Sequence, residues 1–135
     1  MAFKLKMRRL ARQRVVCSLY AQMHQGQLDA WLPDPAALPM ADADWQQELV
    51  QGVCEHINEL DADLAALSVR SLEQVDDLEK CILRLVCYEA RFCPEVPWKV
   101  VITEAVRLAQ DYCSPESYRF INGMAEQLTH KYRAD

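Results

Sequence analysis

Apolar residues recur every three or four positions along most of this chain, and no alternating apolar–polar run of any length occurs. The first spacing puts apolar side chains on one face of an α-helix, whereas alternation is typical of a strand. Helices are therefore predicted over about 5–25, from Asp42 or Asp44 to about 67, over 78–92, over 97–112 and from 115 onward. The expected fold is an all-α, single-domain bundle over 1–135, with five main helices, or six or seven once short ones are counted.

Several predicted helices begin at residues that suit a first turn. Ser71 with Gln74 has the spacing of a capping box, and Ser114 followed by Pro115 suits an N-cap and a first helical position. Residues 26–41 contain three prolines, so this segment is predicted to be a connection.

The segment 78–92 is apolar on most of its circumference, which is typical of a helix in the middle of a bundle. Glu89 falls on its core-facing side. Because an unpaired buried carboxylate is strongly destabilising, Glu89 is expected to be structural, with donors such as the N-terminus of a neighbouring helix. The following helix carries an apolar stripe that starts at Trp98 and continues through Val101 and Ala105.

Candidate catalytic and metal-binding residues are sparse. The six cysteines form no CxxC pair, and the three histidines lack ligand spacing to them, so no metal site is expected. Cys17, Cys54 and Cys81 fall on or beside core stripes, where reduced thiols pack as small hydrophobic groups, as in a reducing cytoplasm. Since neither a nucleophile–base pair nor a glycine-rich phosphate loop occurs, we expect no enzyme and no cofactor.

The longest apolar stretch, 81–88, is short and is interrupted by Arg84, so no transmembrane segment is expected. The basic, acid-free N-terminus also has the composition of a mitochondrial transit peptide. Composition alone leaves this alternative to a cytoplasmic location open.

Positive charge is concentrated at the N-terminus of an otherwise acidic chain. The chain has 15 Lys+Arg and 20 Asp+Glu, yet no acidic residue precedes Asp29. The basic residues before it are Lys4, Lys6, Arg8, Arg9, Arg12 and Arg14. Such a distribution indicates an anionic partner, with nucleic acid as the first candidate. The alternative is a solvated basic arm, with 1–7 flexible.

The arginines lie on the same side of the first helix as its apolar stripe. The residues Arg8, Arg12, Val16 and Tyr20 form one i, i+4 row. We expect the first two turns to overhang the bundle with Arg8, Arg9 and Arg12 along its edge, whereas Arg14 points the other way, into solvent. Cations at a helix N-terminus cost roughly 0.3–1 kcal/mol each, which a bound anion would relieve.

Four segments carry a family resemblance in their order and spacing. They are Arg8-Arg9-Leu10-Ala11-Arg12 with Leu19-Tyr20, Leu83-Arg84-Leu85 with Tyr88-Glu89, Val96-Pro97-Trp98-Lys99-Val100, and Ser117-Tyr118-Arg119-Phe120-Ile121-Asn122-Gly123. From about 8 to 128, the chain resembles the NusB family of bacterial transcription antitermination factors. It departs from that family in Leu10, which interrupts the arginine run, in Trp98, where tyrosine is common, and in its proline-rich first connection.

The resemblance implies an all-helical RNA-binding protein without catalysis. Family members bind boxA-type single-stranded RNA of nascent ribosomal transcripts together with NusE, a small-subunit ribosomal protein, within the RNA polymerase antitermination complex. Arg8, Arg9 and Arg12 match the family's RNA-contacting motif, and Lys4 and Lys6 extend it. No membrane partner is implied.

Each of four residues in the later helices admits two roles. Phe120 matches an RNA-contacting aromatic and is expected near the arginines, stacked on a base; a core residue at the rim is the alternative. Glu116 either accepts from a base edge or complements the helix dipole. Glu79 is a candidate for the NusE interface, again against a role at the helix dipole. Gly123 costs about 1 kcal/mol inside a helix, and either close helix packing or RNA approach accounts for it.

Two other functions stay open at this point. The chain could be a protein-only helical adaptor that kept the fold but not RNA binding. It could also be a detached regulatory domain of an RNA cytosine methyltransferase, since similar domains precede such enzymes.

Overall fold

The computed structural model describes residues 2–24 and 42–133. These ranges form six α-helices and one short 3-10 helix: α1 (Ala2–Met23), α2 (Ala43–Glu55), α3 (Ile57–Leu67), η2 (Leu72–Gln74), α4 (Asp77–Phe92), α5 (Trp98–Tyr112) and α6 (Pro115–Tyr132). No strand occurs in the two ranges, so the all-α prediction is confirmed. The predicted connection 26–41 lies outside the described residues.

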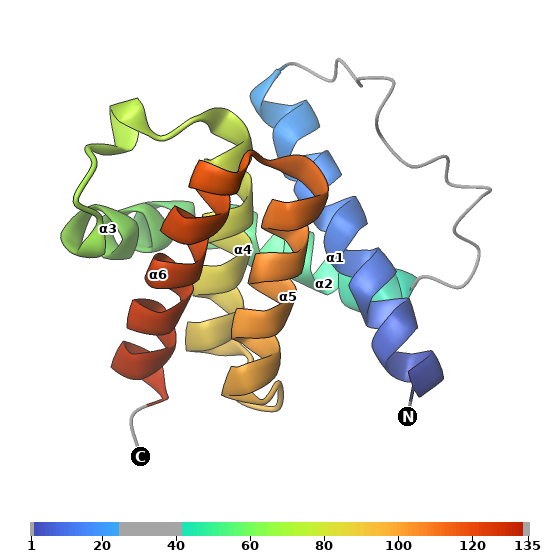
Figure 1. The fold of residues 1–135 in the computed structure, drawn as a ribbon. Helices are drawn as coiled ribbons and strands as arrows, with labels where there is room; N and C mark the ends of the chain where they lie inside the picture. The colour runs from blue at the N-terminus through green and yellow to red at the C-terminus, as the bar shows by residue number, and fades with distance from the viewer. Residues whose placement is uncertain (1, 25–41, 134–135) are drawn as a thin grey trace.

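Helix α4 lies at the centre of the bundle and contacts each of the other five α-helices (Figure 1). Its buried apolar side chains cover most of its circumference: Cys81, Ile82, Leu83, Leu85, Val86, Cys87 and Ala90. A helix that is apolar nearly all round can be stable only where neighbours cover every side. The predicted central position of this segment is therefore confirmed.

The ends of the helices follow from side-chain caps. Asp42 accepts from the Trp45 backbone N–H at 3.1 Å and so begins α2. At the start of α4, Asp76 and Glu79 form the capping box, with bonds of 2.8 and 3.2 Å. The capping box predicted at Ser71 is wrong, because the Ser71 side chain makes no capping bond at η2. The predicted start of α6 at Ser114 is confirmed.

The predicted second helix is divided in two at His56, where the backbone leaves helical geometry between α2 and α3. The His56 ring stacks on Phe92 of α4, with ring centroids 4.3 Å apart. Gly52, one turn earlier, lets α2 approach α4 closely, because an added Cβ would lie 2.2 Å from the Tyr88 ring.

All six cysteines are free thiols. Burial raises the pKa of the Cys81, Cys87 and Cys93 thiols to about 12, which keeps them neutral packing groups. The prediction for Cys54 is wrong, since this side chain is exposed on α2. Over the described ranges, no cluster of possible metal ligands occurs. Within the same ranges, every helix is too short or too polar to span a bilayer.

Candidate nucleic-acid interface

The basic row of α1 packs against the start of α2. The guanidinium groups of Arg8 and Arg12 lie 4.5 and 4.7 Å from the ring centroid of Trp45. Trp45 is buried, and Arg8 also lies 4.0 Å from the Asp42 carboxylate. The predicted azimuth of this row is therefore correct, but the row faces the body of the protein instead of projecting past it.

Arg12 forms a buried ion pair with Glu89 of α4. Its Nε lies 3.1 and 3.0 Å from the two carboxylate oxygens, and its Nη2 donates to Oε1 at 2.7 Å. Both residues are 2% exposed. This corrects the expectation that Arg12 lies along an outer edge, because its guanidinium cannot reach a phosphate from this position. Glu89 has the predicted structural role, but its donors come from Arg12 and not from a helix N-terminus.

A second buried carboxylate, Glu104 of α5, is shared by several arginines. Arg9 donates to it through Nε at 3.0 Å and Nη2 at 3.3 Å. The side chains of Arg12 and Arg107 each approach it to 3.7 Å. Sequence reasoning missed Glu104, although a signal existed: like Glu89, it is a carboxylate on the apolar side of its helix and therefore needs a cation.

The cations that still face solvent define the α1 basic edge, which consists of Lys4, Lys6, Arg8 and Arg9. The two lysines are exposed, and the arginine side chains are 25% and 30% exposed. Residues 2–7 belong to α1, so these lysines are held on a helix. Arg14, predicted to be in solvent, is half-buried.

The first turn of α5 adds an aromatic ring that the sequence pattern assigned to the core. Trp98 is 48% exposed, and the Lys99 ammonium lies 5.5 Å from its ring centroid. Trp98 does continue the α5 stripe, but it is the first residue of the helix. The bundle therefore has no further turn to cover it.

Phe120 lies in the second turn of α6 and is covered by Arg70. The Arg70 guanidinium is 4.0 Å from the ring centroid, and its Nη1 donates to the Glu79 carboxylate at 3.3 and 3.4 Å. Glu79 is 2% exposed. This corrects the expectation that Glu79 presents its carboxylate to a partner, since the group already accepts from Arg70 and from the Asp76 backbone.

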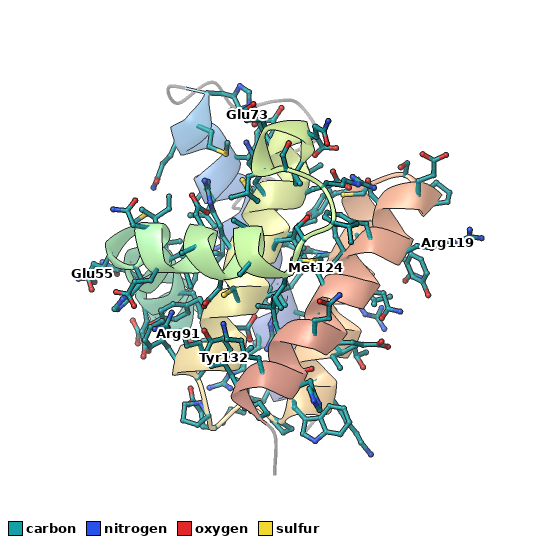
Figure 2. The ribbon with its side chains drawn as sticks, turned by 90° about the vertical axis from the view of Figure 1, so that its left-hand side faces the viewer. Glu55, Glu73, Arg91, Arg119, Met124 and Tyr132 are labelled. Atoms are coloured by element: carbon teal, nitrogen blue, oxygen red, sulfur yellow. The ribbon has the colours of Figure 1, made fainter. Side chains whose placement is uncertain are left out.

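A hollow of about 190 Å³ lies beside Phe120, between α6 and the end of α3. It is lined by Leu67, Val69, Arg119, Phe120, Gly123, Met124 and Gln127. Figure 2 shows Met124 on the side of α6 that faces α3, with Arg119 extending away from the bundle. A Cβ added to Gly123 would meet nothing within 4 Å, so close helix packing does not explain this glycine. Glu116 is exposed in the first turn of α6.

The structure does not bring the arginines and Phe120 into one groove. Figure 1 shows α1 and α5 beginning at one end of the bundle and α6 beginning at the other. A hollow of about 600 Å³ on the molecule's surface is lined in part by Asp76, Asp77 and Asp111. The negative charge of these carboxylates would repel the phosphates of an RNA strand that crossed the hollow. The predicted proximity is therefore wrong, and the two sets of residues form separate surfaces.

Comparison with known proteins gives one consistent relationship. A family model, the NusB family, matches residues 7–129. The transcription antitermination protein NusB of Methylococcus capsulatus is 37% identical over 97 residues, which are 72% of this chain and 49% of that protein. The protein of the same name from Idiomarina loihiensis is 33% identical over 132 residues, which are 98% of this chain and 95% of that protein. The chain thus aligns with about half of the first relative and nearly all of the second.

A solved structure of T. maritima NusB shares the fold. It has a TM-score of 0.74 and covers 93% of this chain and 92% of its own, with 23% identical residues. At that identity the likeness supports the architecture alone.

Proposed function

This chain belongs to the NusB family, and from that premise we propose that it is a transcription antitermination factor. In this proposal it binds boxA-type single-stranded RNA of nascent ribosomal transcripts together with NusE, in the cytoplasm, as part of the RNA polymerase antitermination complex. The observation that carries the RNA part is the α1 basic edge, where exposed cations occur on a helix that has no acidic residue.

The α1 basic edge contacts phosphates. Lys4 and Lys6 have no carboxylate on their own helix, and a phosphate is the anion that the positive end of α1 favours. Arg8 and Arg9 each keep one side toward solvent and can donate to a phosphate without leaving their carboxylates. Arg12 supports these contacts from inside, because its pair with Glu89 fixes α1 on α4.

Phe120 and Glu116 form a second RNA contact at the other end of the molecule. Arg70 covers part of the Phe120 ring but does not line the neighbouring hollow, so the ring remains accessible from that side. A base stacked there gains contact with an aromatic face, and Glu116, one turn earlier, can accept from its edge. An RNA strand that contacts both the α1 basic edge and Phe120 must follow most of the 22-residue α1, which is roughly 33 Å long.

NusE contacts the start of α4, and the contribution of Glu79 there is indirect. Its carboxylate holds both the capping box of α4 and the Arg70 side chain. A change at Glu79 would therefore disturb the shape of this surface and the cover of Phe120 together.

Titration of RNA with and without NusE tests the proposal. A boxA-type oligonucleotide should bind more tightly than a scrambled one of the same composition, and NusE should increase the difference. Equal affinities for the two RNAs, with and without NusE, would contradict sequence-specific binding. NusE binding without any RNA binding would instead support a protein-only adaptor.

A further inference from the structure

We propose that Trp98 is a base-stacking residue, which holds one unpaired nucleobase of a strand whose phosphates lie on the α1 basic edge. This inference rests on the proposed RNA binding and adds a contact on a different helix. It is carried by the exposure of the ring, by the charges around it and by the position of the α5 start beside the α1 start.

The ring is available for a ligand. Among the described residues, the large hydrophobic side chains that are exposed are Leu5, Val69 and Trp98, and Trp98 is the aromatic one. Trp45 cannot serve, because it is buried under Arg8 and Arg12. An indole with half of its surface in water offers a flat face that any base can stack on.

The charge recorded next to the ring is positive. Lys99 lies beside the ring, and Leu5, Arg9 and Lys99 line one hollow of about 150 Å³ with Val100, Thr103 and Glu104. The first turns of α1 and α5 therefore share this hollow, and Figure 1 shows both helices beginning at the same end of the bundle. The carboxylate of Glu104 is buried and already paired with arginines, so it adds no free negative charge to this hollow. The exposed acidic residue nearest to Trp98 in the sequence is Glu95.

This combination favours a nucleotide over an apolar protein segment. A protein interface of useful size needs a contiguous apolar patch, whereas here the ring lies beside Lys99, and Leu5 shares a hollow with Arg9 and Lys99. Phosphates next to Lys99 and Arg9 would leave their bases within reach of the ring, which is how single-strand sites combine charge with aromatic platforms.

Tryptophan fluorescence tests the inference directly. Intact protein is titrated with a boxA-type RNA and, separately, with heparin, which is anionic but carries no bases. RNA should quench an emission component that is absent from Trp98→Phe, whereas heparin should bind without that quenching. Trp98→Leu should weaken RNA binding roughly five- to a hundredfold with an unchanged salt slope, and Trp98→Phe should restore most of the affinity. Circular dichroism checks that both variants are folded.

The outcomes separate this inference from the proposed function. Full affinity in folded Trp98→Leu, without quenching in the wild type, would overturn the role of Trp98 and leave RNA binding intact. Equal quenching by heparin would overturn it as well, because stacking would not be the cause. Loss of NusE binding or of self-association in Trp98→Leu, with RNA binding unchanged, would assign the ring to a protein interface. Absence of RNA binding in the wild type would overturn both proposals.

Discussion

Arg12 and Glu89 face each other inside the molecule, although 77 positions separate them in the chain. Their contact joins the first helix to the central one by a bidentate pair in which both side chains are almost completely buried. One of the three arginines that match the family's RNA-contacting motif is thus a structural residue. The proposed RNA contact therefore falls to the residues around it.

Removal of one partner of this pair should destabilise the protein strongly. Arg12→Met or Glu89→Gln should each lower the free energy of unfolding by about 3–5 kcal/mol, because each leaves a buried polar group without its partner. Urea denaturation followed by circular dichroism measures the change. Arg119→Met, at an exposed arginine of α6, serves as the matched control and should change the stability by only about 0.5 kcal/mol or less. Arg12 would have to be reassigned as an RNA ligand if Arg12→Met kept its stability but lost RNA affinity.

Replacement of the exposed lysines of α1 should change the salt dependence of RNA binding. The double variant Lys4→Ala, Lys6→Ala should flatten the slope of log affinity against log salt by about 1.4, at roughly 0.7 for each lost phosphate contact. Filter binding or anisotropy at several salt concentrations gives the slope. Lys80→Ala, on α4, removes a cation elsewhere and should leave the slope unchanged. An unchanged slope in the double variant would move the phosphates away from this edge.

The two glycines of the described helices should respond in opposite ways to the same substitution. Gly52→Ala should lower stability by about 1–3 kcal/mol, because the new Cβ would lie 2.2 Å from the Tyr88 ring and force it to shift. Gly123→Ala should raise stability by about 1 kcal/mol, because its Cβ meets open space and alanine suits a helix better. Thermal or urea unfolding compares the two variants. Should Gly123→Ala also weaken RNA binding while it stabilises the fold, the hollow beside Phe120 would be part of the interface.

Asp63 should make the stability of the protein sensitive to acid. This residue of α3 is 8% exposed and accepts from Arg91 at 3.1 Å, from Lys131 at 3.2 Å and from Tyr132. Burial by itself raises the pKa of Asp63, but the bonds from Tyr132 and Lys131 outweigh burial and hold the pKa below its ordinary value. Because the folded-state pKa is the lower one, this stabilisation is complete above the unfolded value of about 3.9 and is lost as pH falls through the folded value.

Urea unfolding between pH 7 and pH 2.5 tests this expectation. Asp63→Asn should be less stable than the wild type by about 1–3 kcal/mol at pH 7, and the difference should shrink as the pH falls below about 4. Glu126→Gln, an exposed change on α6, is the control and should follow the wild-type profile. A constant difference across the whole pH range would mean that the charge of Asp63 does not contribute.

Periodicity predicted the helices and the central place of α4 because both depend on local spacing. It also gave the correct side for Arg8 and Arg12, since azimuth on a helix is a local property. The partners could not be predicted in this way. Glu104 and Glu89 come from other helices, and their contacts with α1 exist only after the helices pack.

Exposure was the least predictable property. Trp98 occupies a stripe position, but it is exposed because α5 begins there, at an end of the bundle. Cys54 follows the buried Val53 on α2 and lies beside the apolar stripe instead of on it, and its side chain is exposed. Phe120 carries the expected aromatic ring, but its cover by Arg70 depends on the path of the chain after α3.

The carboxylates around α1 have a consequence for how the protein meets a distant anion. Arg8, Arg9 and Arg12 each lie within 4.0 Å of a carboxylate, those of Asp42, Glu104 and Glu89. From distances much larger than these separations the three pairs are close to neutral, so long-range attraction of an RNA would depend on Lys4 and Lys6. The lysines would therefore govern the association rate, and Arg8 and Arg9 the lifetime of the complex once it has formed.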